Sequence, residues 1–449
     1  MRDWANRVRL GNSLVLMVLV GLALRLALIV WLRYYDFPSA YSLLAPPHFH
    51  FEFGYETGAV AYSLATGHGF SSPFGGSTGP TAWLAPLYPA MCALVFKGFG
   101  CFTFASGVVI LLINSAFSAL TCIPICRIGE LTVGRKVGYW SGWIWATGVI
   151  FMRWPTTWVW EMSASALLIS VLFLQSLQLG KQASGKRWAG FGLLWGIAAL
   201  TNPTLLAFLP AAGLYPTFKL WRRHERWFSH AAVSAVVFAV VISPWLIRNR
   251  VVLGTWVFIR DNAPFELSLG NYHGSNGTGW FGKHPTQNKW EYANYKRMGE
   301  LAYVASKKHL VITFVKQYPR EFAGLCATRV EAFWTGTALD YEHPLIEPWR
   351  PWVYWPLSAL MLAGLIVAVA WRVDGGWLYF WLLLLYPITY YLMFAQPRYR
   401  HAIEPEMLLL GTYFAYSALQ ELRKRFPVKQ QSRVELQPAL AQAHEKVTD

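Results

Sequence analysis

Ten long apolar segments are the feature of this sequence that most restricts its fold. They cover 12–32, 105–124, 137–152, 161–178, 189–202, 203–218, 229–247, 352–371, 377–395 and 403–420. An α-helix needs about 20 mostly apolar residues to cross the hydrocarbon core of a bilayer. The sequence therefore predicts an all-α polytopic membrane protein with about ten transmembrane helices.

Most of the basic residues lie in short segments between the apolar ones. Hydrophobic residues make up 55% of the chain and charged residues 14%, yet the formal net charge is +16. In a ten-helix topology the basic clusters in 7–9, 127–136, 181–187, 219–226 and 423–425 all fall on one side. Because basic loops stay in the cytoplasm, we predict that both chain ends are cytoplasmic. The charge thus orients helices among membrane lipids, and we predict no nucleic-acid partner.

The remaining segments divide the chain into four predicted parts. These are a transmembrane module at 1–248 with a first outer loop at 34–86, an extracytoplasmic lobe at 249–350, C-terminal transmembrane helices at 351–421 and a disordered cytoplasmic tail at 422–449. Within the lobe, residues 300–334 have helical periodicity with Lys and Arg on one side, which predicts amphipathic helices at the membrane surface.

Residues 86–100 are apolar but short, contain two prolines and end in glycine. If this segment crossed the membrane, every later loop would change sides and the basic clusters would lie outside. We therefore predict a juxtamembrane or re-entrant helix there.

Ionisable residues gather at the predicted outer face, where they are candidates for a site. They are Glu52 and Glu56 in the first outer loop, Arg153 and Glu161 in the second, Arg248 at the end of the seventh apolar segment, and Arg398 and Arg400 in the last outer loop. A carboxylate can deprotonate a hydroxyl or bind a cation, and arginine can hold a phosphate by paired hydrogen bonds. This combination suits a reaction in which a phosphorylated lipid is the leaving group.

Each of these candidates also has a structural explanation. Glu161 would favour the start of a helix through the helix dipole. Arg398 and Arg400 would serve equally as interfacial anchors to lipid headgroups. Arg25 lies inside the first apolar segment, where an unpaired charge is costly, so it should face protein or reach a phosphate and has no catalytic role.

A metal site is an open alternative in the first outer loop. His48, His50 and Glu52 alternate, so an extended segment would place them on one side. Zinc normally needs a further ligand or a water in fixed geometry, and three such residues in a surface loop are more often only polar. We therefore name a divalent metal as a weak candidate and no other cofactor.

Several segments resemble bacterial membrane glycosyltransferases of the GT-C type, in particular the group of the dolichyl-phosphate-mannose protein mannosyltransferases and aminoarabinose transferases. They are FGYETGAVAYSLATGHGFSSPF, TGPTAWLAPLYP, WEMSASALL, RNRVVLGTWVFIRDNAPFELSLGN and RYRHAIEPEMLLL. The resemblance implies that a carboxylate of the first outer loop activates the acceptor. It makes Glu56 the first candidate for this base, Glu52 the second, and Glu161 the second acidic residue of the site.

The resemblance further implies transfer of a sugar from a polyprenyl-phosphate carrier to an acceptor at the outer face of a bacterial cytoplasmic membrane. Arg398, Arg400, Arg248 and Arg153 are the candidates for binding the donor phosphate. The acceptor, whether lipid, glycan or protein, stays open.

Three other functions fit parts of the pattern. A multi-pass transporter would use the Asn202-Pro203 and Ser243-Pro244 steps as helix breaks, but it predicts charged sites at the bilayer midplane rather than at outer helix ends. A ligase that uses a lipid-diphosphate-linked glycan is closer in chemistry. A non-catalytic assembly partner would not need the carboxylates.

Overall fold

The computed structural model describes residues 2–32, 53–181, 184–337 and 349–425, with the side chains of 2–12 and Phe281 left out. The described residues are mostly helical and contain no strand. All ten predicted apolar segments fall on helices. The bundle consists of α1 (Arg2–Leu32), α4 (Phe104–Leu120), α5 (Cys122–Leu131), α6 (Arg135–Thr147), α7 (Val149–Thr157), α8 (Met162–Leu179), α9 (Gly185–Thr201), η3 (Pro203–Phe208), α10 (Leu209–Arg222), α11 (Trp227–Leu253), α16 (Arg350–Ala370), α17 (Gly376–Leu385), α18 (Ile388–Leu392), η5 (Pro397–Ile403) and α19 (Glu404–Arg425).

Five helices in the described residues are long and apolar enough to cross a membrane, by length and composition only. They are Ser13–Leu32, Phe104–Leu131, Met162–Leu179, Trp227–Leu253 and Arg350–Ala370. Several other predicted spans are broken into shorter helices, for example at Gly148 between α6 and α7 and at Pro387 before α18. The count of ten transmembrane helices therefore stays a prediction.

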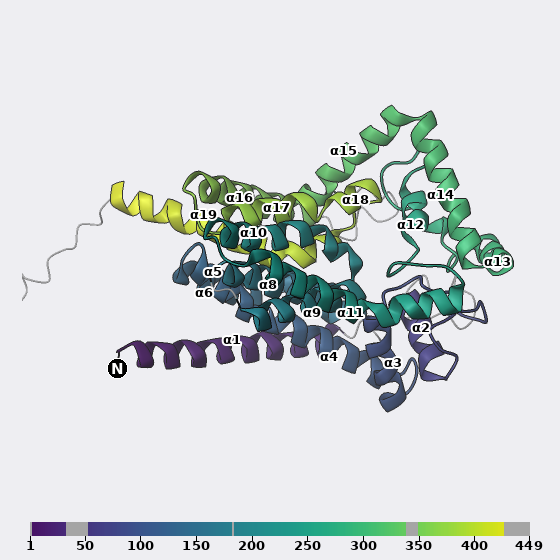
Figure 1. Cartoon of the computed structure of the whole chain (residues 1–449), viewed down its shortest axis with the longest axis horizontal. Coiled ribbons are helices and arrows are strands. Elements are labelled where there is room, and N and C mark those ends of the chain that lie inside the picture. Colours follow the sequence, from purple (N-terminus) through teal and green to yellow (C-terminus); the bar gives the residue numbers. More distant parts are fainter. Residues whose placement is uncertain (1, 33–52, 182–183, 338–348, 426–449) are drawn as a thin grey trace, which may run out of the picture.

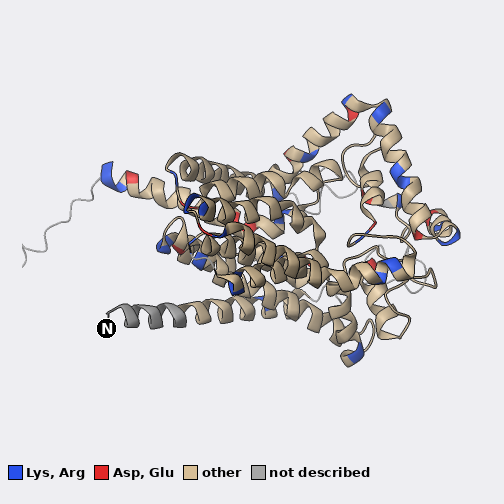
Figure 2. Ribbon diagram, in the orientation of Figure 1, with Lys and Arg blue, Asp and Glu red and all other residues tan. Residues whose placement is uncertain are grey.

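The bundle helices run roughly along the long axis of the molecule (Figure 1). The start of α1 and the end of α19 lie at the same end of the bundle, as an even number of crossings requires. Charged residues gather mostly at the two ends, and the helices between them are largely uncharged (Figure 2). This is the distribution expected when lipid replaces water around the middle of a bundle.

The opposite end of the bundle carries the elements that were predicted to lie at the outer face. They are α2 (Glu56–Ala65), α3 (Leu87–Phe99), α12 (Ala263–Gly270), η4 (Phe281–Lys283), α13 (Lys289–Met298), α14 (Glu300–Gln317) and α15 (Pro319–Thr335). Helix α3 occupies the segment expected to be juxtamembrane; its 13 residues span only about 20 Å, less than the hydrocarbon core. Helices α14 and α15 form the helical part predicted over 300–334.

Small residues let the bundle helices pack closely. Helix α16 packs against α19, and a Cβ at Gly364 would lie 2.0 Å from the backbone oxygen of Leu410, so only glycine fits there. Arg25 on α1 is fully buried and faces protein, as expected. Its guanidinium donates to the Ser118 hydroxyl at 3.1 Å and to the Ala146 carbonyl at 3.0 Å. Its charge therefore serves to connect helices.

Candidate active site

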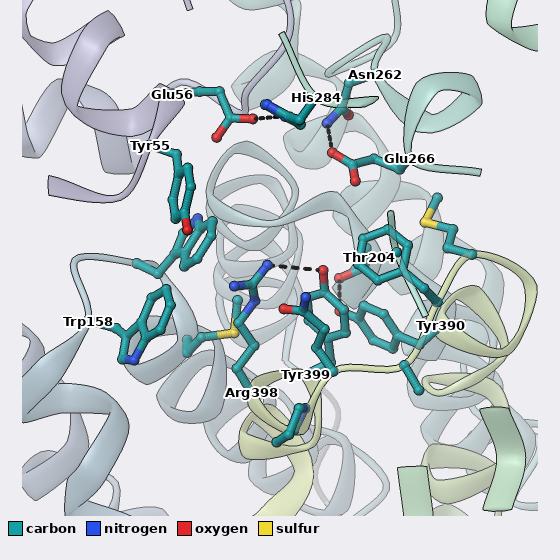
Figure 3. Close-up of a pocket in the computed structure, with 18 of the residues that line it drawn as sticks. Tyr55, Glu56, Trp158, Thr204, Asn262, Glu266, His284, Tyr390, Arg398 and Tyr399 are labelled. Atoms are coloured by element: carbon teal, nitrogen blue, oxygen red, sulfur yellow. Dashed lines mark hydrogen bonds and ion pairs between the residues drawn. The ribbon is translucent and has the colours of Figure 1, made fainter. Parts of the chain in front are cut away.

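A cavity of about 1140 Å³ lies where the outer ends of the bundle helices meet the lobe. Its walls come from α2, the segment between α7 and α8, the start of α12, the region around η4, and η5 with the residues before it. Four of the predicted site residues line it: Glu56, Glu161, Arg153 and Arg398. Residues separated by more than 300 positions thus converge on one space (Figure 3).

Glu56 is the first residue of α2 and is 7% exposed. The two residues before it have positive φ, +77° at Gly54 and +52° at Tyr55. A Cβ at Gly54 would lie 2.1 Å from the Val159 carbonyl oxygen. Only glycine therefore lets this turn pack against the segment that contains Val159. This tight turn fixes the start of α2 and with it the direction of the Glu56 carboxylate.

His284 holds this carboxylate. Its Nε2 lies 2.9 Å from Oε1 of Glu56, and its Nδ1 lies 2.6 Å from the Thr286 hydroxyl (Figure 3). Phe74 and Phe265 pack against the imidazole edge to face, at ring-centroid distances of 5.5 and 5.2 Å. Both ring nitrogens are therefore engaged, and the imidazole orients Glu56 rather than offering a free base of its own.

The carboxyl groups of Glu56 and Glu266, which both line the cavity, have pKa values shifted in opposite directions. Burial by itself raises the pKa of Glu56, but the charge and hydrogen bond of His284 outweigh it and hold the pKa below its usual value. Burial raises the pKa of Glu266 on α12, and the negative charge of Glu56 raises it further. Asn262 donates to Glu266 Oε1 at 2.9 Å. Opposite shifts within one site keep Glu56 ionised and favour the protonated form of Glu266.

Arg398 provides a positive group near Glu161 and Glu266, and its charge favours their ionised forms. Its guanidinium lies 3.8 Å from the ring centre of Trp160, and Nη2 lies 3.3 Å from the Tyr399 hydroxyl. Within the described part of the chain it has no ion-pair partner, and its buried Nε has no hydrogen bond. Figure 3 shows Arg398 across the cavity from the pair of Glu56 and His284. Several of its donors are thus available to an anionic ligand.

Glu161 and Arg153 lie in the segment that closes another side of the cavity. Glu161 directly precedes α8 and lines the cavity. The Arg153 guanidinium lies 4.8 Å from the ring centre of Trp154. Arg260 and Arg350 line the cavity as well, so four arginines surround three carboxyl groups.

Arg400 and Arg248 do not line the cavity. Arg400 is fully buried among bundle helices, with Nε 3.5 Å from Glu404 and the guanidinium 3.9 Å from the ring centre of Tyr354. Arg248 donates to the backbone carbonyls of Phe70, at 2.7 Å, and of Thr81, at 2.6 Å, and so braces the segment between them. Nothing in the structure tests their predicted role toward a donor phosphate.

The proposed metal ligands fall outside the described residues, because His48, His50 and Glu52 all lie in 33–52. In the part of the chain that is described, no three His, Cys, Asp or Glu side chains are grouped as a metal site. The divalent metal therefore stays a prediction, and no step below depends on it.

Sequence reasoning missed His284, Glu266, Arg260 and the aromatic wall of Trp158 and Trp160. The segment that contains Arg260 and Glu266 was part of the observed resemblance, but no role followed from it. His284 stands alone in a polar loop, and only the tertiary fold brings it to Glu56. Its proximity to a carboxylate 228 positions earlier has no local signal in the sequence.

Comparisons with known proteins reveal similarity in structure alone. No protein-family profile and no curated protein sequence matches the chain. A solved structure of the archaeal oligosaccharyltransferase AglB from Archaeoglobus fulgidus, in complex with an inhibitory peptide and a dolichol-phosphate, aligns with 98% of this chain and 54% of that chain. The sequence identity is 11% and the TM-score is 0.51.

A crystal structure of the Archaeoglobus fulgidus oligosaccharyltransferase with Zn and sulfate aligns with 92% of this chain and 50% of that chain, at 10% identity and a TM-score of 0.48. The chain spans about half the length of these structures. The likeness to AglB concerns the fold, and it does not distinguish the protein mannosyltransferase and aminoarabinose transferase group. The chain therefore shares its overall fold with the aligned part of AglB.

Proposed function

We propose that this protein is a glycosyltransferase that moves a sugar from a polyprenyl-phosphate carrier to an acceptor of the cell envelope. The reaction takes place at the outer face of a bacterial cytoplasmic membrane. One observation carries the proposal: an oriented carboxylate, Glu56, and an arginine with available donors, Arg398, face the same cavity at the end of an apolar bundle.

The two groups match the two charges that develop during sugar transfer. A hydroxyl oxygen of the acceptor attacks the anomeric carbon, and a new C–O bond forms as the bond from that carbon to the phosphate oxygen breaks. The hydroxyl proton passes to the Glu56 carboxylate, and the bonding electron pair stays on the phosphate. Arg398 stabilises the growing negative charge on the phosphate by charge-assisted hydrogen bonds. A single displacement of this kind inverts the anomeric configuration.

His284 suits this reaction because it keeps Glu56 ionised and correctly oriented before the acceptor arrives. A carboxylate with a lowered pKa is a weak base, so it takes the proton only when the attacking hydroxyl has become acidic in the transition state. The hydrogen bond at 2.9 Å limits the rotation of the carboxylate.

The aromatic wall beside Arg398 offers a surface for the sugar or for the first isoprene units of the carrier. Trp158 and Trp160 stack at 5.5 Å with an interplanar angle of 12°, and Tyr55 stacks on Trp160 at 5.8 Å. Flat aromatic faces suit the C–H faces of a sugar and the apolar chain of a lipid alike. The AglB structure was solved with a dolichol-phosphate, which supports a lipid-linked donor for this fold.

A ligase that takes a glycan from a lipid diphosphate is the second candidate. Arg260 and Arg398 both line the cavity, and neither forms an ion pair with a described residue. A lipid diphosphate would engage both of them, whereas one arginine can hold a single phosphate. The same base chemistry at Glu56 serves both donors.

Purified full-length protein in detergent tests the proposal. Release of polyprenyl phosphate is measured from a panel of polyprenyl-phosphate sugars, and release of polyprenyl diphosphate from lipid-diphosphate sugars, each with an envelope extract as the acceptor source. Replacing a general base costs about 10²–10⁴-fold in rate, so Glu56→Gln should lose that much activity. Glu421→Gln, at the exposed end of α19, is the matched control and should keep full activity.

The outcomes separate the candidates. Turnover of monophosphate donors that collapses in Glu56→Gln supports the proposal. Turnover of diphosphate donors alone favours the ligase. If Glu56→Gln is as active as the wild type, the base lies elsewhere, and if no donor is turned over, glycosyl transfer is refuted in favour of a transporter or an assembly partner.

A further inference from the structure

A second cavity, of about 530 Å³, lies on the other side of Tyr55. Tyr55 lines both cavities. Along α2, Ala59, Tyr62 and Ser63 line the second cavity, and their spacing places these three on one face of the helix. Glu56, the next residue after Tyr55, faces the first cavity (Figure 3). The start of α2 therefore lies between the two cavities: Tyr55 lines both of them, and the next residue, Glu56, lines only the first.

The second cavity is neutral and rich in hydroxyl groups. Among the described residues that line it there is no Lys, Arg, Asp or Glu, whereas the first cavity has charged groups of both signs. Its other wall is the turn between Ser71 and Pro80, which is held by the hydrogen bond from Ser72 N to Gly79 O at 2.9 Å. Four serines, two tyrosines and a histidine face this space.

Several of these polar groups have no partner in the described protein. The hydroxyls of Tyr62, Ser63 and Ser77 form no hydrogen bond with any described residue, and His68 engages only its Nδ1, with Thr66 at 2.9 Å. Such groups can both donate and accept, as a ligand with many hydroxyls requires. The ring of Tyr62 is 44% exposed and stacks on Phe102 at 5.5 Å and 22°. It thus offers a flat aromatic face beside the hydroxyl groups.

We propose that this second cavity, hereafter the hydroxyl-lined cavity, binds the acceptor, and that the acceptor is a neutral saccharide. This inference rests on the proposed function. The described lining residues include no charged side chain, so a phosphorylated lipid or a charged peptide would lose hydration without gaining a partner among them. The volume is within the range of about 300–1,000 Å³ that is typical of small-molecule sites. Tyr55 lines both cavities, so this site adjoins the cavity that Glu56 lines.

The backbone at Tyr55 supports a fixed boundary between the two cavities. A φ of +52° with a ψ of −112° is a rarely populated conformation for a residue with a side chain. Residues held in this way are common at functional sites, because the surrounding structure must enforce them. Here the conformation holds the Tyr55 ring against Trp160 while the helix begins at Glu56.

Binding of neutral disaccharides to the full-length protein in detergent tests the inference by saturation-transfer NMR. The probes are a mannose, a glucose and an N-acetylglucosamine disaccharide, with a glucuronate-containing disaccharide for comparison. Tyr62→Ala removes the aromatic face, and Ser63→Phe fills the cavity. We expect at least one neutral probe to bind the wild type at millimolar concentration and its signal to fall about tenfold or more in both variants.

Tyr318→Ala is the matched control, because Tyr318 is 40% exposed and lines neither cavity. It should bind the probe as the wild type does. The inference is overturned if no neutral disaccharide binds, if the glucuronate probe binds more tightly, or if binding survives both Tyr62→Ala and Ser63→Phe in protein that elutes as a single species.

Failure of the proposed function is recorded separately. If the wild type turns over no donor in the assay described above but still binds saccharides, glycosyl transfer is refuted and saccharide binding is not. Turnover of donors without saccharide binding would refute only the hydroxyl-lined cavity as the acceptor site.

Discussion

Two groups of charged residues from the same stretch of sequence have opposite surroundings. Arg400, His401 and Glu404 are at most 1% exposed and pair with one another inside the bundle, where His401 Nδ1 lies 2.9 Å from Glu404. Arg398, only two residues before Arg400, faces the cavity and has no carboxylate partner among the described residues. Arg400, His401 and Glu404 connect helices, whereas Arg398 is available to a ligand. Of these two arginines, only the one without a carboxylate partner among the described residues lines the cavity.

Arg398→Gln should show the largest effect among the tests of this comparison. If the guanidinium stabilises the leaving phosphate, its loss should lower kcat/KM for release of polyprenyl phosphate by about 10²–10³-fold. Arg398→Lys keeps the positive charge but loses the planar guanidinium that forms paired hydrogen bonds, so it should retain part of the activity. If Arg398→Gln were as active as the wild type, the reaction would not need the Arg398 guanidinium, and the proposed functional difference between Arg398 and Arg400 would be wrong.

His284→Asn should reduce activity at neutral pH by roughly tenfold to a hundredfold, because a hydrogen bond to a charged group is worth about 1.5–3 kcal/mol. The pKa of Glu56 is held down by His284, so the acidic limb of the pH–rate profile should move to higher pH in this variant. His309→Asn on α14 is the control and should leave the profile in place. A lower rate with an unshifted limb would assign His284 a purely structural role.

Arg400→Gln should reduce stability rather than catalysis. Removing one partner of a buried ion pair costs about 3–5 kcal/mol, so the free energy of unfolding in detergent should fall by that order. Arg127→Gln breaks an exposed pair with Glu130 at 2.9 Å and should cost less than about 1 kcal/mol. A selective loss of activity in stably folded Arg400→Gln would instead support its predicted contact with the donor phosphate.

Asp261→Asn should change the pH dependence of stability rather than the rate of the reaction. Burial, together with Glu300, raises the pKa of Asp261 to about 8, whereas an unfolded chain has a value near about 4. The folded protein therefore keeps a proton that the unfolded chain loses, and this stabilisation is present at low pH and lost as the pH rises to about 8. The pH dependence of Tm between pH 5 and 9 should be flatter in the variant.

Glu421→Gln, at the exposed end of α19, serves as the control for Asp261 and should keep the wild-type slope. The buried pair connects the lobe to the segment before α3, since Glu300 accepts hydrogen bonds from Ala82 N and from the Tyr295 hydroxyl, both at 2.6 Å. A variant slope as steep as the wild type would show that Asp261 is already ionised in the folded protein.

The sequence by itself determined the helical segments, since apolar length and turn residues are local properties that lipid and backbone hydrogen bonding act on directly. It also made Glu56, Glu161, Arg153 and Arg398 candidates for a site, because ionisable groups at predicted helix ends stand out against an apolar background. Only the tertiary structure decided which of these share a cavity. It separated Arg398 from Arg400 and brought His284 to Glu56, because side-chain partners depend on packing between segments that are distant in the chain.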